Sequence, residues 1–416
     1  MALLTPLAAV VVSFCFLGVM LYKRVSIGIA LNVTAIILAL LSLSWVEIPK
    51  LIYETTTDIL TISVVLATFG IMLLSQLYSE TGIINHLSKS LSGLIRNPKI
   101  VISILPAIIG FLPVAGGALM SAPLVDSEAE KLELRPEKKT YVNLWFRHTI
   151  FPMYPLNQAL IITVALTGMT MGSIILRQIP AVIVMIIIGY FVGLRSKSQQ
   201  EENRRPRAEV KTNADLKSFL VTFSPILTAI LVAIVLSSVG FELAQQGFDV
   251  FIAVLAGMIV LIAISRLSLA VFAKPFKTWA IYSVTLASYG AFLLRSTIMA
   301  TEIPEIFQTL AANGSVNTLL LLTVVPALSG FLTGSPSGGV ALSISILSGI
   351  MNNFTVGTAA LIYMSCYLGY LIAPIHLCLT FTAEYFKCPF GKMYKYVIPS
   401  FLITFGAAIL TYFLVV

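Results

Sequence analysis

Two apolar segments of the chain carry glycine, proline and small hydroxyl residues near their middles. They read GFLPVAGGALMSAPLV over 110–125 and GFLTGSPSGGVALSISIL over 330–347. Glycine lets backbone N–H and C=O groups approach a ligand closely, and a helix that begins beyond a turn offers free N–H donors to an anion. Close helix packing through small residues is the alternative. We expect solute binding at Gly116, Gly117, Ser121, Thr333, Ser335, Ser337, Gly338 and Gly339.

Each of these segments is followed by an apolar stretch that proline interrupts. The interruptions read FPMYP over 151–155 and IAPIH over 372–376. Proline removes a backbone donor and frees a carbonyl group one turn earlier, and Na⁺, like other hard cations, takes oxygen ligands. A simple proline kink is the alternative. We predict a cation site made of Ala115, Gly116, Pro152, Pro155, Gly334, Ser335, Ala373 and Pro374.

Three polar side chains lie in or beside the interrupted stretches. Asn157 and His376 occupy equivalent places just past the two interruptions. His376 could carry a coupling proton because an unperturbed imidazole titrates near neutrality, donate a hydrogen bond to a solute, or be a satisfied packing residue. Arg147 could fix a carboxylate through its planar guanidinium or extend toward lipid headgroups. All three are candidate solute-binding residues.

The whole chain is markedly apolar. Of 416 residues, 58% are hydrophobic and 11% are charged, a composition typical of a membrane protein. A helix of about 20 apolar residues crosses the hydrocarbon core of a bilayer, and such stretches recur along the sequence. We predict ten transmembrane helices, at 4–21, 25–44, 57–77, 141–168, 174–194, 218–238, 249–266, 279–297, 354–385 and 394–415.

The two segments rich in small residues, 98–125 and 316–350, are predicted to be re-entrant hairpins. Non-helical backbone is tolerated at membrane depth where it is buried in protein or lines a wet cavity. With two hairpins, most loop Lys and Arg residues fall on one side, which we assign to the cytoplasm. The first hairpin then enters from the cytoplasm and the second from outside. The chain is predicted to cross the cell (inner) membrane several times, with both termini on its external side. The net charge of +8 is therefore a topology signal, and no nucleic-acid partner is expected.

An internal repeat relates the two halves. PAIIGFL at 106–112 matches PALSGFL at 326–332, and LATFG at 66–70 matches LASYG at 286–290. Each half contains five spans and one hairpin, and an odd number of spans inverts the second half relative to the first. Inverted repeats with broken elements at the midplane are typical of secondary transporters. We predict a first repeat over 1–194, a cytoplasmic linker over 195–217 and a second repeat over 218–416.

The LPVAGGALMSAPLVD and GFLTGSPSGG segments resemble a family of prokaryotic integral membrane proteins that carries a domain-of-unknown-function label. More broadly, the chain resembles the ion transporter superfamily, which includes dicarboxylate and citrate carriers, the membrane subunit of tripartite carboxylate transporters and arsenite permeases. The resemblance implies a scaffold domain, a mobile transport domain, elevator-type movement and a homodimer. Carried over to this chain, the resemblance points to Gly116, Gly117 and Ser121 on the first tip and to Thr333, Ser335, Ser337, Gly338 and Gly339 on the second. The paired Ser-Asn-Thr tip motif of the dicarboxylate carriers is absent from this chain.

The sequence therefore predicts an all-α, polytopic secondary transporter of a small anionic organic solute, such as a carboxylate, coupled to Na⁺ or protons. The alternatives are an inorganic-ion carrier, namely an arsenite permease or a cation/proton antiporter, and a channel or membrane scaffold. An enzyme is not expected, because HExxH, GxSxG and phosphate-loop motifs are missing. We expect no resident cofactor; Na⁺ is a possible transported ion. Cys15, Cys366, Cys378 and Cys388 show no metal-ligand spacing, so we expect them to be packing residues.

Overall fold

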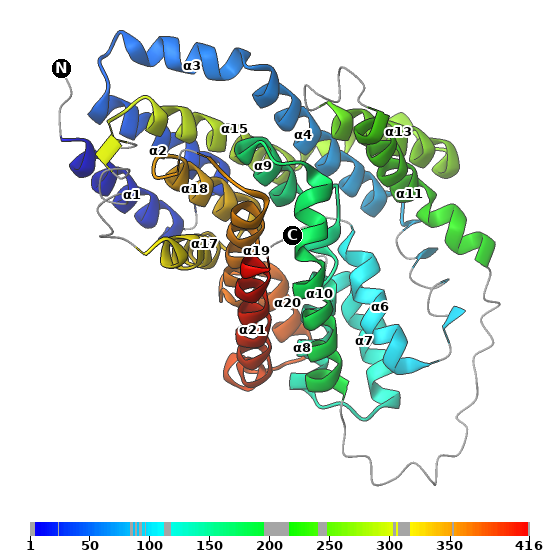
Figure 1. Cartoon of the computed structure of the whole chain (residues 1–416). Coiled ribbons are helices and arrows are strands. Elements are labelled where there is room, and N and C mark those ends of the chain that lie inside the picture. The colour runs from blue at the N-terminus through cyan, green and yellow to red at the C-terminus, as the bar shows by residue number, and fades with distance from the viewer. Residues whose placement is uncertain are drawn as a thin grey trace.

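The computed structural model describes twelve ranges of the chain: 5–23, 25–83, 86–87, 90, 94–95, 97–111, 118–194, 216–239, 248–302, 305–306, 317–351 and 353–414. Every regular element within them is helical (Figure 1). The first half holds α1 (Pro6–Tyr22), α2 (Ile27–Ser42), α3 (Glu47–Thr57), α4 (Ile59–Glu80), α6 (Pro98–Gly110), α7 (Ala118–Lys131), α8 (Pro136–His148), η1 (Phe151–Met153), α9 (Gln158–Thr167) and α10 (Met171–Leu194). The second half holds α11 (Leu216–Val239), α13 (Asp249–Ser265), α14 (Leu269–Ala273), η2 (Pro275–Lys277), α15 (Trp279–Met299), α17 (Thr318–Thr333), α18 (Pro336–Ser348), α19 (Val356–Ile372), α20 (Leu377–Tyr385) and α21 (Phe390–Phe413).

Several helices are long and apolar enough to cross a membrane. Within the described ranges they are Ile59–Glu80, Pro136–Thr167, Met171–Leu194, Leu216–Leu236, Val356–Tyr385 and Phe390–Phe413. Two of these six are interrupted, at the two proline-containing stretches. Shorter apolar helices, including α1, α2 and α13, accompany them. This composition is consistent with a polytopic membrane protein, because a hydrocarbon core of roughly 30 Å requires such lengths.

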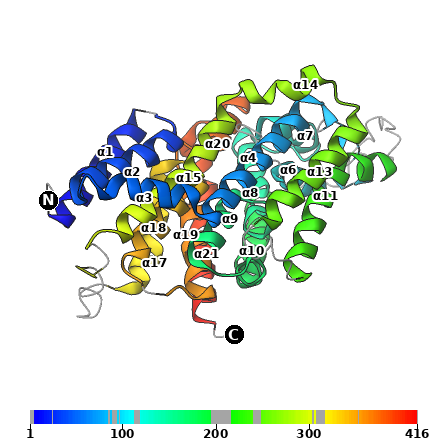
Figure 2. The same ribbon diagram turned by 90° about the horizontal axis from the view of Figure 1, so that it is seen from above.

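A row of helices runs across the molecule (Figure 2). Consecutive neighbours in the row are α1, α2, α15, α4, α13 and α11, so helices from the two halves alternate at its centre. Ser288 of α15 donates a hydrogen bond to Thr68 of α4 (2.9 Å) at this centre. Glycines bring the helices close: a β-carbon at Gly290 would lie 2.9 Å from the β-carbon of Leu31. The row is therefore a continuous layer shared by both halves.

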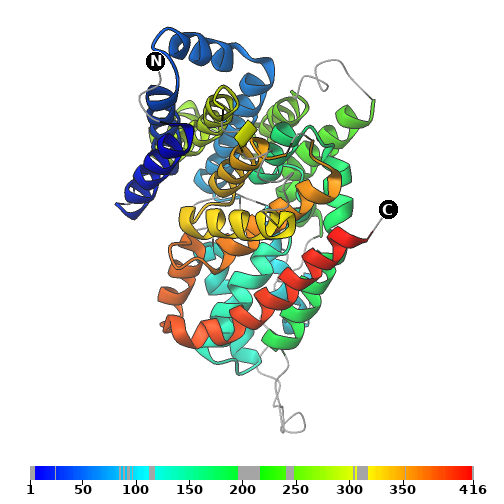
Figure 3. The same cartoon turned by 60° about the vertical axis from the view of Figure 1, so that its left-hand side comes forward.

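A second group of helices lies beside this row. This group, the block, contains α6, α8, α10, α17, α19 and α21. In it α10 packs along α21, α8 along α6, and α17 along α19; Figure 3 shows α17 in yellow crossing α19 in orange, with red α21 beside green α10. On α21 the buried residues recur every three or four positions, at Met393, Val397, Ser400, Thr404, Ala408 and Thr411. On α19 every residue from Thr358 to Leu371 is buried. α21 therefore faces the exterior on one side, whereas α19 is enclosed by protein.

Both predicted hairpin segments contain two packed helices. α6 packs against α7, and α17 packs against α18. In the second hairpin the turn is made by Gly334, whose φ of +57° suits glycine, and by Ser335, whose hydroxyl oxygen accepts a hydrogen bond from the backbone N–H of Gly338 (3.3 Å). Proline follows at the first helical position of α18, where its missing N–H costs nothing. The turn of the first hairpin, over 112–117, lies outside the described residues.

Candidate functional site

Each of the two interrupted spans is divided into two helices by a short break. α8 ends at His148, the 3₁₀ helix η1 follows, and α9 starts after Asn157. The Asn157 side-chain oxygen accepts a hydrogen bond from the Leu160 N–H (3.2 Å), so Asn157 is the N-cap of α9. In the second half α19 ends at Ile372 and α20 starts after His376. The predicted interruptions are therefore present as breaks of the helix in both halves.

The two breaks meet in the interior. The rings of His148 and His376 lie edge to face, with centroids 4.8 Å apart and planes at 89°. The Tyr370 hydroxyl lies between them, 2.5 Å from His376 Nε2 and 3.5 Å from His148 Nε2. Both histidines are at most 1% exposed. A polar cluster thus joins a residue of the first half to the second half, away from solvent.

Tyrosine hydroxyls of α19 engage the backbone at the first break. Tyr367 donates to the carbonyl oxygen of His148, and Tyr363 donates to that of Phe151 at 3.2 Å. Tyr363 also lies 3.5 Å from the Asn157 side-chain oxygen. These three contacts, with Tyr370 one turn further along, place one face of α19 against the break of the first half.

The second break is engaged in the same way. Tyr394 donates to the Ile372 carbonyl oxygen (2.9 Å) and Thr380 to that of Pro374 (3.1 Å). In this conformation hydroxyl groups therefore donate to backbone carbonyl oxygens at both breaks. A cation site at Pro152, Pro155, Ala373 and Pro374 stays a prediction.

Arg147 lies beside this cluster. It is 1% exposed and is among the largest fully buried side chains, so its guanidinium lies in the protein interior instead of extending to a surface. Its backbone carbonyl lies against Gly110 of α6: a β-carbon added there would be 2.6 Å from that oxygen. The backbone of Arg147 thus lies where the first hairpin meets the broken helix.

The second hairpin tip contacts the second break and α19. A β-carbon at Gly334 would lie 2.7 Å from an Ile375 side-chain atom, and one at Gly339 would lie 2.7 Å from Cys366 Sγ. Gly338 faces Ile27 of α2. The predicted tip residues therefore lie together, between the row and the block.

Hydroxyl groups at this tip bond mainly to one another and to nearby backbone. Ser335 and Ser337 share a hydrogen bond of 3.2 Å, and Thr333 donates to the Ser329 carbonyl oxygen (2.7 Å). Solute binding by these residues stays a prediction.

The first tip is only partly described. Ala115, Gly116 and Gly117 lie outside the described residues. Ser121 is fully buried, and its hydroxyl donates to the Ala118 carbonyl oxygen (3.2 Å). Asn143 of α8, which the sequence did not single out, donates to the same oxygen (2.9 Å), so a buried amide supports the start of α7.

Sequence reasoning also missed Cys378 and the three tyrosines. Ligand atoms of His148, His376 and Cys378 lie within 4.8 Å of one another. His376 and Cys378 lie two residues apart at the start of α20, but His148 ends α8 in the other half, so the sequence does not show the three as one motif. A signal for the tyrosines does exist: positions 363, 367 and 370 are spaced so as to share one helix face.

The family comparison covers nearly the whole chain. A family model described as "Protein of unknown function (DUF401)" matches residues 3–416. No curated protein matches the chain. Because the match spans all described helices, the chain belongs to the DUF401 family.

Proposed function

We propose that this protein is a secondary active transporter of a small anionic organic solute, such as a carboxylate, coupled to Na⁺ or protons. It works in a cell (inner) membrane by alternating access, with an elevator-type displacement, as a homodimeric relative of the ion transporter superfamily. The observation that carries the proposal is the meeting of the two helix breaks at His148 and His376. Solute sites of secondary transporters are formed by discontinuous helices of two repeats near the midplane.

The charge and donors around the breaks favour an anion. Arg147 carries a guanidinium group, whose planar fork matches a carboxylate, and a charged residue buried in a membrane protein marks a functional site by default. Tyr363, Tyr367 and Tyr370 bring hydroxyl donors to the same region. A carboxylate would accept hydrogen bonds from hydroxyl groups that turn from their present acceptors on binding, and a guanidinium matches its two oxygens in a planar fork.

The packing of corresponding elements supports the inverted-repeat part of the proposal. α6 packs on α8 as α17 packs on α19, and α7 packs on α20 as α18 packs on α9. The second helix of each hairpin thus contacts the half-helix that follows the break of the other half. This reciprocal packing is what a twofold symmetry axis relating the two halves would produce.

The elevator part of the proposal assigns different roles to the row and the block. The row of α1, α2, α15, α4, α13 and α11 would be the scaffold. The hairpins and the broken helices would move as the transport domain, because they hold the cluster around Arg147. The contacts of α18 with α15 and α2 are the surface along which such a movement would slide.

Uptake into proteoliposomes tests the proposal. Purified protein is reconstituted, and a panel of carboxylates is assayed under imposed Na⁺ or proton gradients. We expect saturable uptake of one class that depends on one gradient. Uptake of inorganic oxyanions or metal cations alone would favour an inorganic-ion carrier, and non-saturating passive flux would favour a channel; either result overturns the proposal.

A pair of arginine variants makes the test specific. Arg147→Gln should weaken solute affinity roughly 10- to 100-fold, because a hydrogen bond to a charged group contributes about 1.5–3 kcal/mol. Arg177→Gln is the matched control: Arg177 of α10 donates to the Tyr412 carbonyl oxygen (3.2 Å), away from the breaks. Equal losses in both variants would contradict the role of Arg147.

A further inference from the structure

We propose that His148, His376 and Cys378 form a binding site for a thiophilic transition-metal ion of the zinc class. This inference goes beyond the proposed transport function and is independent of it. Two imidazole nitrogens and one sulfur are a ligand set that suits zinc and its soft relatives. All three side chains are buried, at 0%, 1% and 8% exposure for His148, His376 and Cys378.

The distances between the ligand atoms are close to those that an ion requires. The three atoms lie within 4.8 Å of one another. A tetrahedral zinc ion with bonds of about 2.0–2.3 Å places such atoms roughly 3.3–3.6 Å apart. A contraction of about 1 Å, within reach of side-chain rotations, would therefore close the site without a rearrangement of the helices.

The imidazole rings are already oriented for coordination. His148 Nδ1 lies 2.6 Å from the Leu144 carbonyl oxygen, and His376 Nδ1 lies 3.4 Å from that of Leu371. Metal-bound histidines commonly donate their second ring N–H to a backbone carbonyl, which fixes the tautomer and the ring. Both Nε2 atoms are thereby left as the metal-facing nitrogens.

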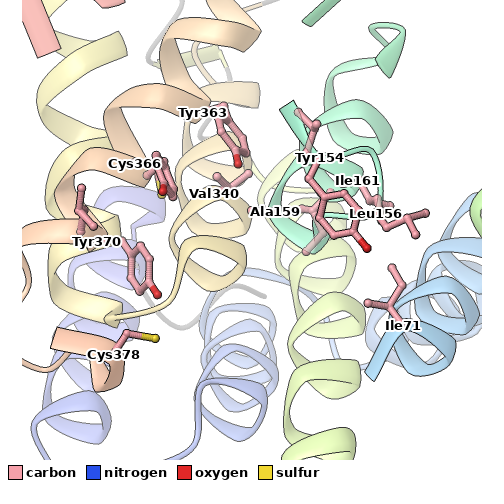
Figure 4. Packing of buried hydrophobic residues seen from close by; sticks show 14 of the residues in the cluster. Ile71, Tyr154, Leu156, Ala159, Ile161, Val340, Tyr363, Cys366, Tyr370 and Cys378 are labelled. Carbon is pink, nitrogen blue, oxygen red and sulfur yellow. The ribbon is translucent and has the colours of Figure 1, made fainter. Parts of the chain in front are cut away.

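Tyr370 marks the position of the ion. Its hydroxyl lies between the two Nε2 atoms, at 2.5 and 3.5 Å, and Figure 4 shows this end of the side chain turned toward Cys378. We infer that the hydroxyl occupies the place that a metal ion would take. Binding would displace it and release the proton of the Cys378 thiol to solvent, since the thiolate is the ligand.

Metal titration of the purified protein tests the proposal. The protein carries an affinity tag without histidine, is stripped with a chelator and is equilibrated with Zn²⁺ or Cd²⁺. We expect one tightly bound ion per chain by elemental analysis, a thiolate-to-cadmium charge-transfer absorption, and a higher midpoint of thermal unfolding, because a ligand stabilises the state that it binds. These measurements need no solute. They therefore test metal binding even if the protein takes up no carboxylate.

Ligand and control variants complete the experiment. Cys378→Ser should abolish the charge-transfer absorption, while Cys366→Ser should keep it; Cys366 is also buried but contacts Pro336 and Gly339. His376→Ala should weaken binding by at least about 100-fold, more than loss of an outer partner does. The exposed His86 provides the matched histidine control, His86→Ala.

Two results would overturn the proposal. One is a charge-transfer absorption that survives Cys378→Ser or is absent from the unmodified protein. The other concerns Tyr370→Phe, which leaves the three ligands in place and should bind the ion at least as tightly as the unmodified chain. Loss of binding in that variant would contradict the placement of the ion at the hydroxyl position.

Discussion

The Tyr363 hydroxyl donates a hydrogen bond to the backbone carbonyl of Phe151, across 3.2 Å. Tyr363 belongs to α19 in the second half, and Phe151 starts η1 in the break of the first half. A break in a membrane helix leaves backbone groups that water cannot satisfy at that depth. One half of the chain thus completes the hydrogen bonding of the other.

Removal of this hydroxyl should destabilise the protein. Tyr363→Phe leaves the ring in place but removes one of the two donors of the Phe151 carbonyl, whose other donor is the Tyr154 N–H (3.4 Å). The loss of one such hydrogen bond costs about 0.5–1.5 kcal/mol. The midpoint of thermal or detergent-induced unfolding measures the change. Tyr190→Phe is the control, since Tyr190 lies on the exterior of α10 at 44% exposure; a similar loss in both variants would show that the bond contributes nothing specific.

The crossing of α17 and α19 should tolerate no added methyl group. Gly330 lies directly against the backbone carbonyl of Cys366, so Gly330→Ala forces two helix backbones apart. Overpacking of this kind costs about 1–3 kcal/mol, and unfolding midpoints would report it. Gly406→Ala in α21 meets nothing within 4 Å and should be neutral or slightly stabilising. Unchanged stability in Gly330→Ala would refute the close approach.

The salt bridge between Lys139 and Asp126 should fasten α7 to α8. Its N···O distance is 2.5 Å, and the two side chains are 14% and 32% exposed. Lys139→Met should lower the free energy of unfolding by about 1 kcal/mol, at the upper end for such pairs. Lys50→Met breaks a pair that is 75% and 61% exposed and should change little. A double-mutant cycle with Asp126→Asn checks the coupling; additive losses would mean that the pair does not interact.

The second hairpin should return to the side from which it enters. After replacement of the four native cysteines, single cysteines are placed at Asn317 and Asn353, which precede α17 and follow α18 and are both exposed. A membrane-impermeant thiol reagent should label both from outside the cell. Labelling from opposite sides would make this segment a full crossing, and the inverted-repeat proposal would fail with it.

Much of the fold follows from the apolar pattern and its interruptions. A helix, or an interrupted pair, lies at each of the ten predicted positions, because runs of about 20 apolar residues leave the chain few alternatives. The hairpin helices also match, although α7 continues to Lys131, beyond the predicted end at 125. The helices α3 and α14 were not predicted, since α3 is too polar and α14, with five residues, too short to stand out.

The candidate site was only partly predictable. Asn157 and His376 could be found because a polar residue beside a proline break is unusual in an apolar run. Cys378 was interpreted as a packing residue, and its neighbour His148 comes from the other half of the chain. Contacts between distant segments depend on how the halves dock, which local spacing does not encode.

α19 has no side that faces lipid, since every residue from Thr358 to Leu371 is buried. A newly made helix of this kind cannot rely on the bilayer as its final environment. We expect α19 to reach its final position only after α9, α10, α17 and α18 have folded. All four precede α19 in the chain and pack against it. Folding would then follow the order of synthesis, and α19 would pack into its place after the helices that precede it have folded.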